Sequence, residues 1–166
     1  MKRIIIIIGT MIAMLFASSK AQTINQFFDK YHDDTRFESV TVGKFMLGLA
    51  KFSSEVDDEE REILDNVNKV RVLTSKDKVN PEFAQEVLAD FQAMVEDENL
   101  EPLVEVKEKG EIVKIYARAK GEAYTDLLIS VKEDDELNLV WISGKLSQQF
   151  LGKIKTGEAG QLAFTR

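Results

Sequence analysis

The chain has no cysteine, one histidine and two prolines among its 166 residues. Without cysteine there is no disulfide framework, no Cys–His nucleophile and no ordinary zinc site. No Gly-x-Ser-x-Gly elbow occurs, and Gly144 with Lys145 lacks the upstream glycine and the following serine or threonine of a phosphate loop. We therefore assign no catalytic residue, no cofactor and no metal, and we expect packing to stabilise the fold.

The single histidine, His32, is followed by Asp33 and Asp34 and allows two interpretations. A histidine beside a carboxylate can act as a base or as a metal ligand. A cationic histidine at a helix end also interacts well with the helix dipole. We favour the helix end, because neighbours in sequence do not by themselves form a catalytic constellation.

Carboxylates are abundant and occur in three clusters. Two of them held close together could serve as a glycosidase pair, and several could bind calcium. No cluster has the spacing of a calcium loop, and each falls at a turn or a helix end, which favours solvated charge. The clusters are Asp57, Asp58, Glu59, Glu60 and Glu62; Glu96, Asp97 and Glu98; and Glu133, Asp134, Asp135 and Glu136.

The N-terminus has the pattern of a secretory signal. Lys2 and Arg3 precede an apolar run that ends at Ala17 and is shorter than the roughly 20 residues of a membrane span. Ser19 and Ala21 are small residues at the positions that signal peptidase reads. We predict a signal peptide over residues 1–21, cleaved after Ala21, with an uncleaved anchor as the alternative.

Removal of residues 1–21 takes away three cations, so the net charge changes from −7 to about −10, and about 145 residues remain. That length forms one domain with a real core. An acidic surface disfavours nucleic acid and anionic lipid as partners. We predict a single domain over residues 22–155, with no membrane span after signal removal, and a flexible tail over residues 156–166.

The first half of the mature chain predicts helices and two strands. Thr23 and Gln26 have capping-box spacing, and Asn80 with Pro81 has the form of a helix start. Apolar stripes predict helices from residue 24 to about 32, over 45–52, from 57 to about 67, and from 81 to about 97. Alternating residues predict strands over 37–42 and 70–74.

Four strands with short turns follow, and they organise the chain. They are predicted over residues 103–107, 112–120, 124–131 and 137–143, with Gly110 in the first turn and residues 132–136 as the third turn. A short helix closes the domain over residues 146–154. The fold class is α+β: a mostly antiparallel sheet with a C-terminal four-strand meander and helices packed on one face. The first two strands could pair in parallel through a helical crossover.

One surface stands out as a candidate for partner binding. Alternation in the second strand of the meander directs Val113, Ile115 and Ala117 to the core and the next residues away from it. An open face with aromatic and cationic side chains in an acidic protein suits a partner. Core or rim packing of Trp141 and Tyr124 is the alternative, and we favour it because Trp141 lies on a strand that is apolar on both faces. The candidate residues are Ile112, Lys114, Tyr116, Arg118, Tyr124 and Trp141.

Several motifs resemble a family of small exported bacterial proteins, common in Bacteroidetes and often lipoproteins, that is known only as a domain of unknown function. The resemblance covers nearly the whole mature chain and implies an envelope or secreted location, no established activity and a link to envelope stress signalling. Gln22 stands where those lipoproteins carry a lipidated cysteine, so a lipid tether is not expected. The motifs are Phe27–Tyr31, Ser39–Val42 with Phe45 and Met46, Val70–Leu73, and Val140–Gly144 with Leu151.

We therefore expect an exported, periplasmic or secreted interaction module, rather than an enzyme, whose partner is an envelope protein or another envelope component. Two alternatives remain open. A carboxylate-based hydrolase needs a concave pocket with two acids held close together. A carrier of a small molecule or lipid needs an apolar cavity between the sheet and the helices.

Overall fold

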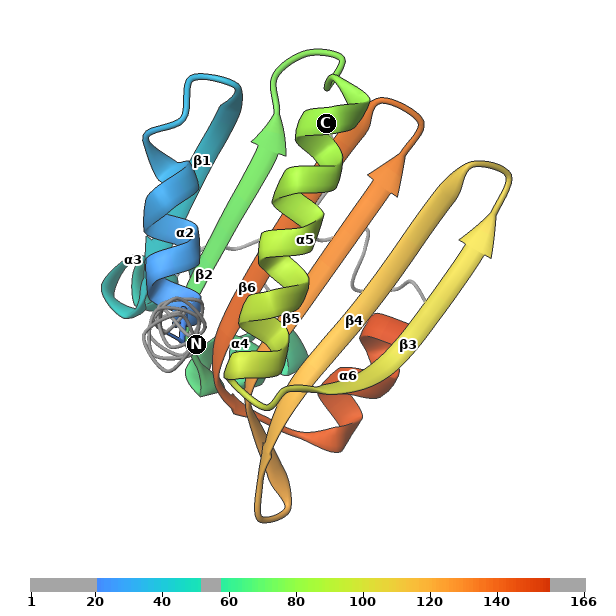
Figure 1. The fold of residues 1–166 in the computed structure, drawn as a ribbon. Coiled ribbons are helices and arrows are strands. Elements are labelled where there is room, and N and C mark those ends of the chain that lie inside the picture. The colour runs from blue at the N-terminus through green and yellow to red at the C-terminus, as the bar shows by residue number, and fades with distance from the viewer. Residues whose placement is uncertain (1–20, 52–57, 156–166) are drawn as a thin grey trace, which may run out of the picture.

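The computed structural model describes residues 21–51 and 58–155. Its centre is one six-stranded antiparallel sheet with the strand order β1-β2-β6-β5-β4-β3 (Figure 1). The strands are β1 (Phe37–Gly43), β2 (Val67–Ser75), β3 (Glu101–Glu108), β4 (Glu111–Lys120), β5 (Ala123–Glu133) and β6 (Glu136–Leu146). The helices are α2 (Ile24–His32), α3 (Lys44–Ala50), α4 (Asp58–Asn66), α5 (Pro81–Asp97) and α6 (Gln148–Lys155).

Two predicted segments lie largely outside the described residues. They are the signal peptide, of which only Ala21 is described, and the tail over residues 156–166. Within the described part of the chain, no helix is both long and apolar enough to cross a membrane.

The predicted α+β class and the C-terminal meander are confirmed, because β3, β4, β5 and β6 are antiparallel neighbours in order. Lys109 and Gly110 both have positive φ, 42° and 98°, as the two-residue turn of a tight hairpin requires. The predicted third turn is shorter than residues 132–136. β5 continues to Glu133 and β6 begins at Glu136. Charged residues can belong to these strands because their side chains remain solvated at the exposed strand ends.

The possibility of a parallel β1–β2 pair is wrong. Gly43, at the end of β1, pairs with Lys69 near the start of β2, so the connection leaves and re-enters the sheet at the same end. That geometry requires antiparallel strands. Val67, predicted as part of the preceding helix, instead opens β2 and is buried.

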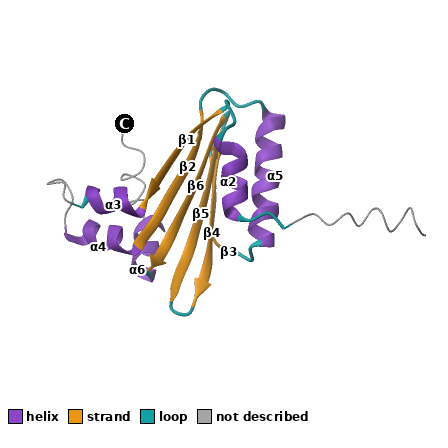
Figure 2. Ribbon diagram, turned by 90° about the vertical axis from the view of Figure 1, so that its left-hand side faces the viewer, coloured by secondary structure: helices purple, strands orange, loops and turns teal. Residues whose placement is uncertain are grey.

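Helices cover both faces of the sheet, which corrects the expectation of helices on one face. α2 and α5 lie on one side, and α3, α4 and α6 lie on the other (Figure 2). The physical reason is that β4 and β5 carry apolar side chains on both faces. Tyr116 and Leu128 join the core under α2 and α5, whereas Ala117 and Leu127 join the core on the other side. We call these sides the α5 face and the α4 face.

The core of the α5 face is rich in aromatic rings. α2 begins with the predicted capping box of Thr23 and Gln26 and buries Phe27, Phe28 and Tyr31. Phe27 meets Phe91 of α5 edge to face, with ring centroids 5.5 Å apart. Such pairs add about 0.5–1.5 kcal/mol beyond the area that they bury. This cluster fixes both helices on the sheet.

Candidate functional site

The six residues predicted as one open surface are divided by the fold. Tyr116 and Trp141 are buried on the α5 face, where Trp141 packs against Phe28 with ring centroids 5.8 Å apart. Tyr124 is half-buried and packs on the α4 face. One open face that includes all six is therefore wrong, and core packing of Trp141, the favoured alternative, is what the structure shows.

Ile112 and Lys114 lie together beside α5, next to the buried Tyr116. In Figure 1, α5 crosses the middle of the sheet, and β4 and β3 extend beyond it. A groove with a volume of about 290 Å³ follows this border. It is lined by Leu88, Ala89, Phe91 and Gln92 of α5, Ile112, Lys114 and Tyr116 of β4, and Ser130 and Lys132 of β5.

The floor of the groove is a set of cross-strand pairs. Ile112 pairs with Lys132, Lys114 with Ser130, and Tyr116 with Leu128. Directly opposed residues of antiparallel strands share a face. The first two pairs present all four side chains to the groove, and the third presents Tyr116, because Leu128 is fully buried. The sequence alternation predicted that Ile112, Lys114 and Tyr116 share a face, and the register shows that they do.

Tyr116 and Gln92, two residues that line the groove, begin a short hydrogen-bond chain. The hydroxyl of Tyr116 donates to Oε1 of Gln92 at 2.9 Å, and Nε2 of Gln92 donates to Oε1 of Glu96 at 3.1 Å. Burial raises the pKa of Tyr116, with a smaller contribution from the negative charges of Glu105 and Glu96. Tyr116 therefore stays neutral, and its ring forms a fixed wall of the groove.

Lysines surround Ile112 on the floor. Lys132 lies opposite Ile112 on β5, and Lys107 lies opposite it on β3. Lys114 is two residues along the same strand. One carboxylate faces this group: Glu105 lies 3.0 Å from Nζ of Lys107 and 4.0 Å from Nζ of Lys114. Three lysines against Glu105 give the Ile112 end of the groove local positive charge in a protein of net charge −7, whereas Glu96 acts on Tyr116 at the other end.

Arg118 lies beyond the groove in a polar network that sequence reasoning missed. It forms an ion pair with Glu98 and lies 3.5 Å from Oδ2 of Asp126. Asp126 is buried and accepts a hydrogen bond from the indole of Trp141. The sequence did contain a signal for this network: Asp126 lies within an apolar strand, and a buried carboxylate needs a polar partner. Arg118 and Trp141 are thus brought together by Asp126 in a structural network.

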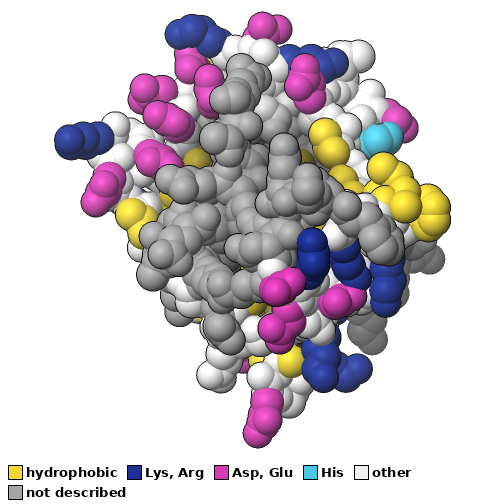
Figure 3. All heavy atoms as spheres, turned by 180° about the vertical axis from the view of Figure 1, so that it is seen from behind, with side chains coloured by type: hydrophobic (Ala, Val, Ile, Leu, Met, Phe, Trp, Pro, Cys, Tyr) yellow, Lys and Arg dark blue, Asp and Glu magenta, His cyan; other side chains and the backbone are white. Residues whose placement is uncertain are grey.

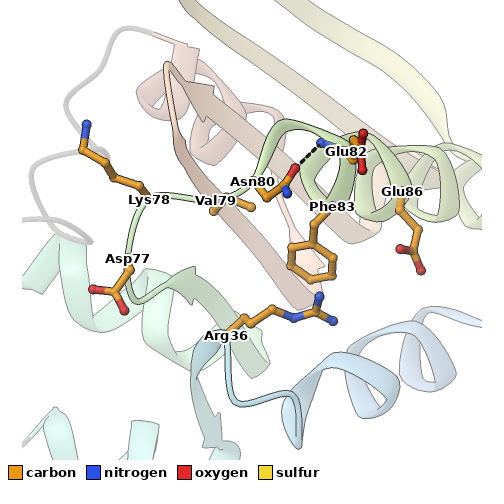
Figure 4. A pocket seen from close by; sticks show the side chains of 8 residues that line it. All are labelled: Arg36, Asp77, Lys78, Val79, Asn80, Glu82, Phe83 and Glu86. Carbon is orange, nitrogen blue, oxygen red and sulfur yellow. Dashed lines mark hydrogen bonds between the residues drawn. The ribbon is translucent and has the colours of Figure 1, made fainter.

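A second pocket, of about 440 Å³, lies at the start of α5 (Figure 4). Its wall is the ring of Phe83, over which the guanidinium of Arg36 lies 3.4 Å from the ring centroid. Asp34 already pairs with this guanidinium at 2.6 Å. The lining also mixes Lys78 with Asp77, Glu82 and Glu86, so neither sign of charge dominates it. We regard the groove as the better candidate site.

The other sequence candidates do not converge. His32 is the last residue of α2, as predicted, and its Nδ1 lies 2.7 Å from the hydroxyl of Ser39. Its ring is half-exposed. Among residues 21–51 and 58–155, no group of three histidine, aspartate or glutamate side chains is placed to hold a metal ion.

Sequence reasoning also missed the wall that α5 contributes. Leu88 and Gln92 are four residues apart and therefore share a helix face, which was a usable signal. The sequence did not indicate that this helix face lies over β4 and β5.

Comparison with known protein families matches residues 31–154, more than half of the chain, to the domain of unknown function DUF4252. A search of curated proteins gave no match.

Proposed function

Because the chain belongs to the DUF4252 family, a domain of unknown function, we propose its role from the geometry: an exported, non-enzymatic binding module that docks an envelope partner in the groove between α5 and β4. The partner is an acidic protein segment. The groove takes one aliphatic or aromatic side chain of this segment, and the lysines on its floor pair with flanking carboxylates.

The observation that carries the proposal is the combination of shape and charge at one place. The groove is concave, and it is lined by the apolar side chains of Leu88, Phe91 and Ile112. Lys114 and Lys132 line the same groove. Binding sites of this kind combine an apolar surface with a few placed polar groups. In a protein of net charge −7, local positive charge also selects the sign of the partner.

The tyrosine at the groove supports a specific contact. Buried tyrosine side chains at interfaces carry much of the binding energy, because a rigid ring loses little conformational entropy on contact. Tyr116 is held in place by its hydrogen bond to Gln92. The groove is therefore preorganised before any partner arrives.

The proposed location is the periplasm or the exterior, and this rests on sequence features alone. Lys2 and Arg3, the apolar run to Ala17 and the small residues before Gln22 have the order of a secretory signal. The mass of the protein recovered from cell envelopes tests this: a mature chain that begins at Gln22 supports export. The full-length mass in the cytoplasmic fraction contradicts it.

The hydrolase and the carrier have less support. No carboxylate is among the residues that line the groove, and the acids of the second pocket lie among Arg36 and Lys78. A carrier needs an apolar cavity, whereas both described pockets are lined in part by charged side chains. These surfaces favour the interpretation that the protein is a binding module.

Site-specific photo-crosslinking in intact cells tests the proposal. A photoreactive phenylalanine analogue replaces Ile112, and the full chain is produced with its own N-terminus. We expect one discrete adduct with an envelope protein. Lys114→Glu combined with Lys132→Glu should reduce the adduct about tenfold or more, because two attractions become repulsions.

Matched controls lie on the same strand. The analogue at Lys120, an exposed residue at the far end of β4, should give no such adduct. Lys120→Glu should leave the Ile112 adduct unchanged. An adduct that forms equally at both positions, or that survives reversal of Lys114 and Lys132, would show that the groove does not bind the partner.

A further inference from the structure

The two edges of the sheet differ in how they are protected. Edge strand β3 contains Pro102 and charges at Glu101, Glu105, Lys107 and Glu108, and its register shifts between Pro102 and Val104. Proline, charge and irregular pairing are the features that stop an edge from recruiting another strand. This edge is closed to further pairing.

Edge strand β1 has almost none of these features. Its sequence from Phe37 to Gly43 contains no proline and one charge, Glu38, and it pairs with β2 in unbroken register. Within the described part of the chain, no strand pairs with its outer side. An edge that is regular and nearly uncharged presents a row of backbone groups that another strand can use.

Apolar side chains are exposed directly beside this edge. Val40 of β1 is 54% exposed, and on α3 Phe45 is 78%, Met46 57% and Leu49 50% exposed. Val40 shares a face with Val42, which packs on the α4 face together with Leu47 of α3. Figure 3 shows hydrophobic side chains gathered at this border of the molecule. We call Val40, Phe45, Met46 and Leu49 the β1–α3 patch.

We propose that the β1–α3 patch is the interface of a homodimer, in which two copies of this chain pair antiparallel through their β1 edges. The two-fold axis then runs perpendicular to the sheet, so both copies present α3 on the same side of one continuous sheet. The exposed rings and aliphatic side chains of the two α3 helices meet across the axis. A closed two-fold contact consumes both open edges and leaves none for further growth.

The charges of β1 and its surroundings favour a second copy as the occupant. The chain as a whole is acidic, so most of its faces repel one another. Around a two-fold axis near Val40, Glu38 of one copy lies opposite Val42 of the other and approaches its Lys44. No like charges of β1 face each other, and the opposite-charge approach occurs twice by symmetry. The strand is thus complementary to itself.

The oligomeric state of the mature protein tests the inference. Sedimentation equilibrium over a concentration series should show a dimer for the natural sequence. Val40→Lys places a charge at the edge and should raise the dimer dissociation constant about 100-fold, because the change is present twice in the interface. Val106→Lys is the matched control, since Val106 is an exposed valine on the other edge strand, 43% exposed.

A second variant covers the case in which Val40→Lys disturbs folding. Phe45→Ser alters a side chain on the helix surface and should also produce monomers with an unchanged circular dichroism spectrum. Three outcomes overturn the proposal: a monomeric natural protein, a dimer that neither variant weakens, and a dimer that Val106→Lys weakens equally.

The absence of cysteine gives a direct test of the pairing. With the axis at Val40, Val40→Cys places the new thiol opposite its own symmetry mate, within the Cα separation of about 4.4–6.8 Å that a disulfide spans, and Ser39→Cys and Thr41→Cys test an axis one residue to either side. Under mild oxidation one of the three should crosslink quantitatively into a dimer, and Val106→Cys should not. Equal crosslinking at Val106 would place the contact elsewhere.

Discussion

The indole Nε1 of Trp141 donates a hydrogen bond to Oδ1 of Asp126 at 2.9 Å, in the interior of the α5 face. Trp141 is on β6 and Asp126 on β5, and both are buried. Asp126 also accepts from the hydroxyl of Thr125 at 3.1 Å, and Arg118 lies 3.5 Å from it. The carboxylate is tolerated in the core because these donors surround it.

Trp141→Phe should destabilise the protein by about 1–3 kcal/mol, because the buried carboxylate of Asp126 loses a donor and the ring loses volume. Urea unfolding followed by circular dichroism measures the change. A double-mutant cycle with Asp126→Ala, which removes the acceptor, isolates the hydrogen bond, and we expect a coupling of about 1 kcal/mol. Strictly additive effects would show that the bond contributes nothing to stability.

Gly144→Ala should be strongly destabilising. A Cβ at this position of β6 would lie 2.1 Å from the carbonyl oxygen of Asn66 and 2.8 Å from Cα of Val67, and both are backbone atoms that cannot turn aside. We expect a loss of about 3 kcal/mol or more, at the upper end of single substitutions. Thermal unfolding of the purified variant measures this loss.

Gly48→Ala is the matched control for that change. A Cβ on Gly48, within α3, meets nothing within 4 Å. Alanine in a helix gains about 0.5–1 kcal/mol over glycine, so this variant should be slightly more stable than the natural protein. Equal losses at both glycines would mean that the close approach at Gly144 is absent in solution.

The ion pair of Asp34 and Arg36 should stabilise the protein only above acidic pH. The hydrogen bonds from the Arg36 side chain, partly opposed by desolvation, lower the pKa of Asp34 from 3.8 to about 2. A depressed folded-state pKa contributes stability that is complete above pH about 4 and is lost as the pH falls toward 2. The contribution should be below about 1 kcal/mol, because Arg36 is largely exposed and solvent screens the pair.

Asp34→Asn tests this pH dependence in urea unfolding at pH 7, 5 and 3. Its stability deficit relative to the natural protein should be constant at the two higher values and smaller at the lowest. Asp33→Asn, at an almost fully exposed neighbour, should show little deficit at any of them. A deficit that grows at pH 3 would contradict the assignment.

Asn80→Ala should cost about 1 kcal/mol, because the side chain of Asn80 accepts from the backbone N–H of Glu82 at 2.8 Å and caps α5. Asn80→Asp keeps an acceptor at the helix N-terminus and should retain nearly full stability. The midpoint of thermal unfolding compares the three proteins. A loss with aspartate as large as that with alanine would exclude capping as the cause.

Most elements could be predicted from the sequence because their signals are local. The stripe of Phe27, Phe28 and Tyr31, the Asn80–Pro81 start and the turn at Gly110 each act over a few residues. The mistaken assignment of Val67 to a helix has the same origin. An apolar residue at a boundary fits both periods, and only its pairing with Gly144 decides between them.

The candidate site was predicted in part. Alternation in β4 put Ile112, Lys114 and Tyr116 on one face, and that grouping is confirmed by the register. The outward direction of that face was wrong for Tyr116, because α5 packs over it. Tyr124 was added without knowledge of the β-bulge between Tyr124 and Asp126, and it lies with the core of the α4 face.

The sequence by itself determined the α+β class, the order of the elements and the meander, since period, caps and short turns are properties of neighbouring residues. Only the tertiary structure decided the strand order of β1 and β2, the covering of both faces, the groove beside α5 and the partner of Asp126. Those features depend on contacts between residues far apart in the chain, such as Tyr116 with Gln92 and Trp141 with Phe28. Such contacts form because both faces of the central strands are apolar, and each face must find a helix to exclude water.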